Sequence, residues 1–282
     1  MIDLEDLPEL NDPIMIVAFE GWNDAGEAAS DALDRLAMLW GAEAVAALDP
    51  EDYYDFQVNR PRVLIEDGLR RIQWRTTRIL LARPPELGRD VLFVSGIEPS
   101  FRWRRFTVEL MQFAHEAGVG MMVTLGALMA DVAHTRPIPV SASADDERTI
   151  HRHDLEHSTY EGPTGIVGVL ADAANQAGLI SISCWAAVPH YASHTPSPKA
   201  TLALLRKVET LLKVSIDPGD LPEMIEGWEA HITELAENDD EVAEYVRALE
   251  QAQDTTELPE ASGDAIAREF ERYLRGHGDH SG

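Results

Sequence analysis

Apolar and polar positions alternate along the chain in a way that predicts buried strands joined to amphipathic helices. The clearest stretch is 160–212. Apolar residues recur there every three or four positions from Ile166 to Ala177, which predicts a helix, and Gly178 stands where helices commonly end. Residues 179–188 are almost continuously apolar, as expected of a strand covered on both faces. A polar turn follows, and Ser197-Pro198 is a helix-start signal.

The same rhythm recurs earlier in the chain. Strands are predicted at 14–19, 42–48, 91–96 and 119–128, the last with Gly126 at its end, and helices at 27–40 and 103–117. Strands that alternate with helices predict an α/β fold with a mostly parallel central sheet flanked by helices. Between 62 and 74, apolar and polar residues alternate on both sides of Asp67-Gly68, which predicts a hairpin. After Gly126 we expect a loop and a short strand, with Asp131, His134 and Arg136 exposed.

Four polar turns follow predicted strands, and in a parallel sheet they should gather at one edge. Ligands of open α/β sheets bind at that edge. The candidate pocket residues are therefore the polar and glycine positions of these turns: Glu20, Asn23, Asp24, Gly96, Glu98, Gly126, Asp131, His190, Tyr191 and His194. Asn23 or Asp24 also suits a helix N-cap. A histidine near carboxylates suits general acid–base work, and packing in the core is its alternative role.

Charge changes the picture at the C-terminal end. The chain of 282 residues has a net charge of −27, which argues against nucleic-acid or anionic-membrane partners. From Asp217 onward there are 19 acidic and 4 basic residues. We therefore divide the chain into an α/β domain at 1–214 and an acidic helical appendage at 215–282. The appendage begins with a predicted capping box at 220–223. Its helices carry apolar stripes that need a partner, either the α/β domain or another subunit.

An arginine-rich segment at 60–89 stands out in this acidic chain. We expect its arginines to pair with acidic surface in the same or a neighbouring subunit; an anionic ligand is the alternative. Cys184, the only cysteine, lies inside an apolar strand and is expected to pack as a small hydrophobic residue. The acidic N-terminus does not resemble a signal peptide, and no apolar run is long enough to span a membrane. These features predict a cytoplasmic protein.

Known catalytic motifs do not account for the sequence. It contains no GxGxxG after the first strand, and no P-loop, GxSxG, HExxH or CxxC. The chain has three lysines, so nucleotide-phosphate chemistry is not expected. His151, His153 and His157 invite a metal interpretation, but no acidic ligand pattern accompanies them and a solvated loop is favoured. We expect no metal and no cofactor.

Five segments together resemble the proteasome assembly chaperone 2 family as it occurs in actinobacteria and archaea. They are IVAFEGWNDAGEAAS at 16–30, YDFQVNRP at 54–61, VLFVSGIEPSFRW at 91–103, VTLGALMADVAHTRP at 123–137, and YEGPTGIVGVLADAANQAGL with PHYASHTPSPKATLALL inside 160–212. The resemblance implies a phosphorylase/hydrolase-like α/β domain, often in homo-oligomers. The eukaryotic namesake helps assemble proteasome α-rings. The resemblance carries no catalytic set onto this chain.

Two functions follow from these observations. The first is a non-enzymatic assembly factor or scaffold with a proteasome-related partner, acting as a homo-oligomer. The alternative is a nucleoside phosphorylase- or hydrolase-like enzyme or binder, with its site where the four polar turns converge.

Overall fold

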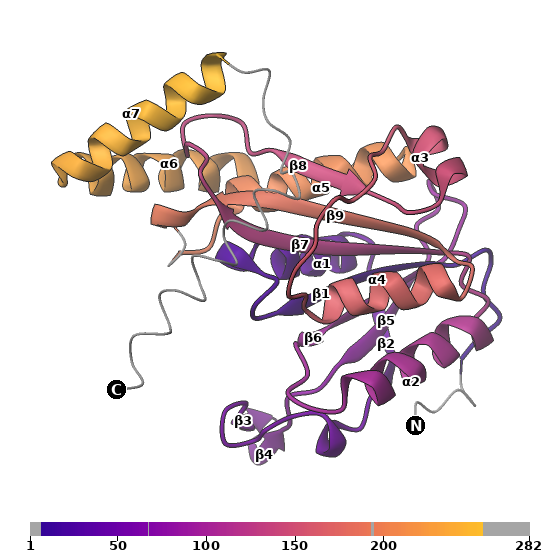
Figure 1. The fold of residues 1–282 in the computed structure, drawn as a ribbon. Coiled ribbons are helices and arrows are strands. Elements are labelled where there is room, and N and C mark those ends of the chain that lie inside the picture. The colour runs from indigo at the N-terminus through magenta and orange to yellow at the C-terminus, as the bar shows by residue number, and fades with distance from the viewer. Residues whose placement is uncertain (1–6, 67, 193–194, 256–282) are drawn as a thin grey trace.

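A seven-stranded sheet lies between layers of helices in the computed structural model, which describes residues 7–66, 68–192 and 195–255 (Figure 1). The strand order is β2-β5-β6-β1-β7-β9-β8. The central strands β6, β1, β7 and β9 are parallel, whereas β2, β5 and β8 are antiparallel to their neighbours. The strands are β1 (Ile14–Glu20), β2 (Glu43–Ala47), β5 (Arg78–Ala82), β6 (Val91–Ile97), β7 (Met121–Ala130), β8 (Val140–Ser143) and β9 (Ile180–Pro189). The predicted α/β fold with a mostly parallel centre is confirmed.

Two apolar layers hold helices to the two faces of the sheet. Successive residues of β1 point to opposite faces. Ile14 and Ile16 contact the layer under α1 (Ala28–Leu39) and α5 (Pro198–Leu212). Met15 and Val17 contact the layer under α2 (Trp103–Glu116) and α4 (Ile166–Gln176). The helices predicted at 27–40 and 103–117 are therefore present within one or two residues.

Strand β9 departs from its prediction because only one of its faces is fully covered. Ile182 and Cys184 are buried against α5, but Ser181, Ser183 and Trp185 on the other face are only partly buried. The prediction that both faces of this strand are buried is therefore wrong. Its sequence, ISISCW, in fact alternates between apolar and polar or aromatic residues, the pattern of a strand with one solvated face.

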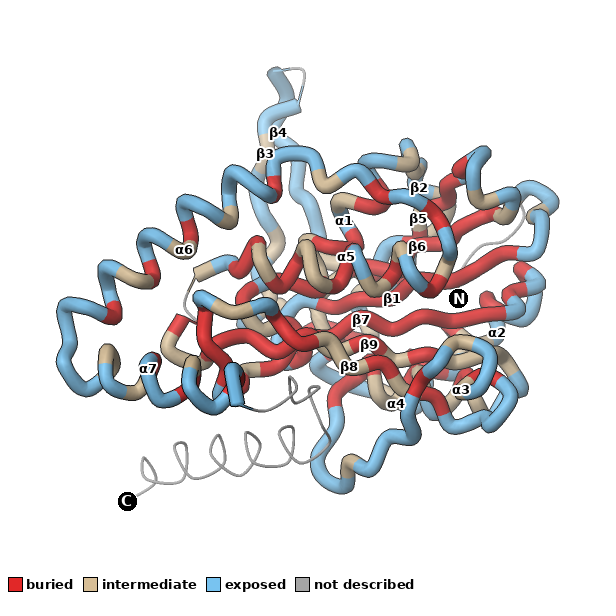
Figure 2. The backbone as a smooth tube through the Cα atoms, turned by 90° about the horizontal axis from the view of Figure 1, so that it is seen from above, coloured by how far each residue is buried: buried red, intermediate tan, exposed pale blue. Residues whose placement is uncertain are grey.

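A hairpin of β3 (Arg62–Glu66) and β4 (Leu69–Gln73) projects away from the sheet (Figures 1 and 2). The two strands pair antiparallel, from Arg62 opposite Gln73 to Glu66 opposite Leu69, which confirms the predicted hairpin. Four arginines of the 60–89 segment pair with acidic residues of the same chain: Arg71 with Glu66, Arg75 with Glu20, Arg83 with Asp90 and Arg89 with Asp12.

Two acidic helices, α6 (Leu221–Glu237) and α7 (Asp240–Thr255), follow the sheet and extend beyond one end of it (Figure 1). Part of the α6 stripe is buried within the chain: Trp228 and Ile232 pack with Ala192 and Tyr191. Asp220 does not cap α6 with its side chain, as the predicted capping box required; it forms an ion pair with Arg35 of α1 at 2.6 Å. The predicted last helix, at 266–274, lies outside the described residues.

Three further local predictions need correction. Gly126 lies inside β7, which continues to Ala130, rather than at its end. The predicted loop containing three histidines includes a short helix, α3 (Glu147–His153), capped by Asp146. His134, expected at the surface, is 1% exposed. Among the described residues, no helix is both long and apolar enough to cross a membrane.

Candidate functional site

The turn after β1 places Asp24 at the start of α1. Its Oδ1 accepts hydrogen bonds from the backbone N–H groups of Ala29 (2.7 Å) and Ser30 (3.1 Å), and Oδ2 accepts from the Ser30 hydroxyl. Burial raises the pKa of Asp24 to about 6, despite these hydrogen bonds. Of the two predicted capping residues, Asp24 is therefore the one that caps α1. Its carboxylate binds the start of the helix and does not face an open site.

Asn23 and Glu98 connect two of the four predicted turns. The Asn23 amide donates to Glu98 Oε1 at 2.7 Å, and the same oxygen accepts the backbone N–H of Ile166 at 2.8 Å. Glu98 thus binds the first N–H of α4, where a helix favours negative charge. Burial raises the pKa of Glu98, while the two hydrogen bonds act in the opposite direction.

Glu20 and Gly96 lie on a smaller pocket of about 250 Å³. Glu20 forms an ion pair with Arg75. A Cβ at Gly96 would lie 2.9 Å from the Thr76 carbonyl oxygen and from Thr77 Cα. The backbone of Thr76 and Thr77 therefore leaves room only for glycine at this position. The predicted residues of β1 and β6 are close together, but Glu20 and Asn23 line different pockets.

Asp131, His190 and Tyr191 lie where the C-terminal helices meet the ends of β7 and β9. The Tyr245 hydroxyl on α7 donates to Asp131 Oδ1 at 2.8 Å, and His190 Nδ1 lies 3.6 Å from the same oxygen. The rings of His190 and Tyr245 meet edge to face, with centroids 5.2 Å apart. These residues join α7 to the sheet. His194, the last predicted member, lies outside the described residues.

His134 is the buried centre of this joint. The Tyr191 hydroxyl accepts the His134 backbone N–H at 2.8 Å and lies 2.8 Å from Nδ1, while Nε2 lies 2.9 Å from Thr233 Oγ1 of α6. All of these bonds are satisfied when Tyr191 donates to Nδ1 and a neutral imidazole donates from Nε2. Burial, together with nearby Lys199, lowers the pKa of His134. Lys199 donates to the His134 carbonyl and to Glu229 of α6, which adds further bonds between the sheet and that helix.

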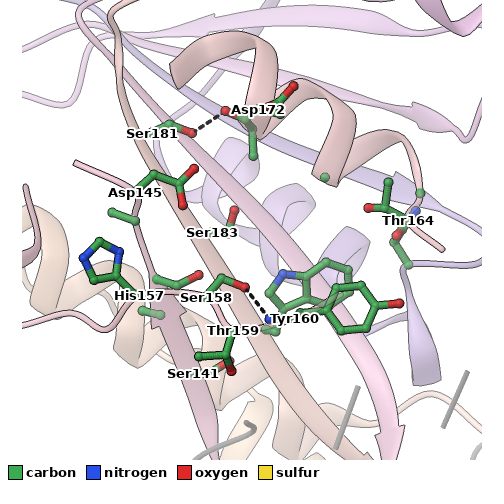
Figure 3. A pocket seen from close by; sticks show the side chains of 18 of the residues that line it. Ser141, Asp145, His157, Ser158, Thr159, Tyr160, Thr164, Asp172, Ser181 and Ser183 are labelled. Atoms are coloured by element: carbon green, nitrogen blue, oxygen red, sulfur yellow. Dashed lines mark hydrogen bonds between the residues drawn. The ribbon is translucent and has the colours of Figure 1, made fainter. Parts of the chain in front are cut away.

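A larger pocket of about 480 Å³ lies over the uncovered face of β8 and β9. Figure 3 shows its hydroxyl and carboxylate side chains. The hydroxyls come from both strands and from the loop before α4: Ser141, Ser143, Ser181, Ser183, Ser158, Thr159, Tyr160 and Thr164. Asn23 is the one predicted site residue that lines it. Sequence analysis missed this pocket, although its signal was present in the alternating residues of VSAS and ISISCW.

Gly126 shapes this pocket from behind. A Cβ on Gly126 would lie 2.6 Å from the indole ring of Trp185, which lines the pocket. The absence of a side chain in the middle of β7 therefore allows Trp185 to lie across the neighbouring strand. Gly126 acts through packing rather than through a bound ligand.

The one thiol and two of the candidate carboxylates serve the fold. Cys184 is fully buried, and burial raises the pKa of its thiol to about 12, which leaves the thiol un-ionised and unreactive. Asp24 and Glu98 use their carboxylates to hold helix starts. Within 7–66, 68–192 and 195–255, no group of three or more His, Cys, Asp or Glu side chains could hold a metal ion.

Comparison with known proteins places the chain in a family. The PAC2 family model matches residues 18–236. A PAC2 family protein from Streptomyces avermitilis is 54% identical, with a TM-score of 0.79 over 83% of this chain and 100% of that one. A proteasome-assembly chaperone homologue of Mycobacterium tuberculosis is 49% identical, with a TM-score of 0.75 over 83% of this chain and 99% of that one. The chain belongs to the PAC2 family, which confirms the resemblance.

A more distant structure shares the fold. An archaeal proteasome activator from Pyrococcus furiosus is 20% identical, with a TM-score of 0.67 over 83% of this chain and 98% of that one. No curated protein matches the chain.

Proposed function

We propose that this protein is a non-enzymatic assembly factor that acts in the cytoplasm as a homo-oligomer on a proteasome-related protein. Family membership supports the proposal, because a relative that is 49% identical over nearly its whole length is a proteasome-assembly chaperone homologue. The predicted residues also support it. At each of the four turns, described residues are tied to helix starts or to the C-terminal helices.

The projecting hairpin carries the proposal, because an assembly factor needs an accessible contact surface. Val63, Ile65 and Ile72 are 47, 70 and 51% exposed. Val63 pairs with Ile72 across the two strands, and Ile65 follows Val63 by two positions, so the three side chains share one face of the hairpin. A two-stranded hairpin is marginally stable alone in water, and an apolar face needs cover.

Charge favours a second copy of this chain as the occupant of that face. Residues 62–73 carry three arginines and two acidic residues, a net charge of +1, whereas the whole chain has a net charge of −27. Its own acidic surface therefore complements the hairpin. This contact would build the homo-oligomer, which would then present its remaining surfaces to the partner protein.

Light scattering on a gel-filtration column tests the self-association. Wild type should elute as an oligomer at micromolar concentration, and Ile65→Glu, with Val63→Glu added, should elute as a monomer. Met38→Glu is the matched control, because Met38 is an 81% exposed apolar residue on α1, outside the hairpin. A monomeric wild type, or equal dissociation by the control, would exclude the hairpin contact.

Co-purification tests the partner separately. Tagged full-length protein, captured at native levels from its own cells, should retain proteasome components above the background of an untagged strain. Their absence under gentle, low-salt conditions would contradict the assembly role, whatever the oligomeric state.

A further inference from the structure

The pocket over β8 and β9 has polar walls built from regular structure. Ser143 stands opposite Ser183, and Ser141 stands opposite Trp185, in the antiparallel pair of strands. These side chains share the face that no helix fully covers, and Trp22, Trp185 and Tyr160 add aromatic surface to the walls. Hydroxyl groups on two adjacent strands, in a concave site with aromatic walls, provide hydrogen-bonding positions for a ligand.

Acidic side chains outnumber basic ones at the pocket. Asp145, Glu156 and Asp172 line it, and none of the described lining residues is lysine or arginine. His157 also lines it, with its Nε2 3.1 Å from Glu147 Oε1. Asp145 accepts from the Asn175 amide at 2.9 Å and Asp172 from the Gln176 amide at 2.7 Å, so these contacts leave both carboxylates uncompensated by positive charge. Anionic ligands such as phosphate are therefore disfavoured, and cations are favoured.

The start of α4, which also borders the pocket, does not reverse this preference. A helix N-terminus attracts anions, but Glu98 already occupies the Ile166 N–H. Beside it, Asn23 is 1% exposed, and its Oδ1 accepts no hydrogen bond from the described residues. An unpaired buried acceptor is costly, and a small movement of the Asn23 side chain toward the pocket would let a ligand N–H or O–H group satisfy it.

We propose that this pocket binds an organic cation through a primary ammonium or guanidinium group. The carboxylates at the rim neutralise its charge and the serine hydroxyls and Asn23 accept its N–H groups. The aromatic walls of Trp22, Trp185 and Tyr160 contact its positive face or its alkyl chain. The group could come from a free polyamine or from a lysine or arginine side chain of a peptide. This inference stands apart from the proposed assembly role.

Calorimetric titration of the full-length protein tests the proposal. Spermidine and a short acetylated, amidated Gly-Lys-Gly peptide supply the cation from the two sources, and the same peptide with acetyl-lysine supplies an uncharged analogue. Inorganic phosphate and trehalose test an anion and a neutral polyol. We expect saturable binding of at least one cationic probe, weakened by added salt, and none of the three uncharged or anionic probes.

Matched variants locate the binding. Asp145→Asn and Asp172→Asn should each weaken it about threefold to fivefold, the upper part of the range for exposed ion pairs, and the double variant by about tenfold. Glu226→Gln on exposed α6 removes one negative charge elsewhere and should leave it unchanged. Thermal melts of each variant verify folding.

Each outcome either supports the cation site or overturns it. Binding of spermidine alone identifies a free amine as the ligand class, and binding of the lysine peptide alone identifies a protein side chain; either supports the site. No saturable binding of any cation at millimolar concentration overturns it. Equal weakening by Glu226→Gln, or equal binding of trehalose, also overturns it, because the contact would then be diffuse or independent of charge.

Discussion

Two polar regions border the carboxyl half of this sheet, and they differ in how their hydrogen bonds are used. At the joint beneath α6 and α7, Tyr191 and Lys199 form hydrogen bonds with His134. His134 and Lys199 also form hydrogen bonds with Thr233 and Glu229 of α6. In the pocket over β8 and β9, Ser181 donates to the Ala171 carbonyl and Ser183 accepts from Thr124, but Ser141 and Ser143 line an open volume without a described partner. The first region holds the fold together, and the second is free to hold something else.

The difference shows that a polar turn after a strand does not by itself indicate a ligand site. His190 and Tyr191 follow a strand of a parallel sheet, the position where ligand sites are expected. Here the acidic C-terminal helices cover that position, and the polar groups bond to them. A site interpretation therefore requires knowing what else in the chain packs against the turn.

The largest expected effect comes from breaking the joint. Trp228→Ala should lower the free energy of unfolding by about 3 to 5 kcal/mol, because a large buried ring leaves a cavity. Trp228 is 7% exposed and packs with Ala192 and Tyr191. Urea unfolding measures the change, and limited proteolysis should show cleavage between α5 and α7.

Leu235→Ala on the same helix is the control for that variant. Leu235 is 51% exposed, so its truncation should cost less than about 0.5 kcal/mol. Equal effects of the two substitutions would show that α6 is not anchored through Trp228.

The second effect depends on pH and arises at the cap of α1. The folded pKa of Asp24, about 6, lies above the ordinary value, so folding takes up a proton at pH values between the two. Wild type therefore loses stability relative to Asp24→Asn as pH rises from about 4 to 6. From the two pKa values, the free energy of unfolding of wild type relative to Asp24→Asn should fall by roughly 2 to 3 kcal/mol over this range and stay constant above it.

Asparagine is a suitable replacement for Asp24 because it keeps an acceptor for the Ala29 and Ser30 N–H groups and does not titrate. The difference between the two unfolding curves, measured at each pH, cancels the other acidic groups. A difference that stays flat from pH 4 to 7 would show that Asp24 titrates normally.

His134 gives a smaller, opposite dependence. Its folded pKa is lowered, so the joint is most stable with a neutral imidazole, above the unfolded pKa of about 6.5, and weakens as pH falls through the folded pKa. His134→Gln should cost about 1 to 2 kcal/mol at pH 8, and the cost should shrink toward pH 5. A cost that grows on acidification would contradict the neutral assignment.

Sequence patterns predicted the layers of this fold better than they predicted its site. The strands at 14–19 and 91–96 are apolar on both faces, and the structure buries both faces. Ser181 and Ser183 mark the half-covered face of β9 in the sequence, but the apolar residues around them also match a strand buried on both faces. Gly126 was placed at a turn, because sequence alone does not show that a tryptophan from a neighbouring strand lies against it. The burial of His134 depends on Thr233, 99 positions away, and no local pattern reports such a contact.

The smallest change in stability is expected for the pocket serines, and it tests the difference between the pocket and the joint directly. Ser141→Ala and Ser143→Ala each remove a partly exposed hydroxyl on the open wall, so the free energy of unfolding should change by less than about 0.5 kcal/mol. Tyr191→Phe removes a hydroxyl from the joint, where it serves both the His134 N–H and its ring, and should cost about 1 to 3 kcal/mol. Urea titration of the three variants checks the contrast, and calorimetry with spermidine should show the reverse order, with binding weakened by the serine substitutions and unchanged in Tyr191→Phe. If the serine variants lost as much stability as Tyr191→Phe and bound the amine normally, the pocket hydroxyls would be structural, and the two regions would not differ in kind.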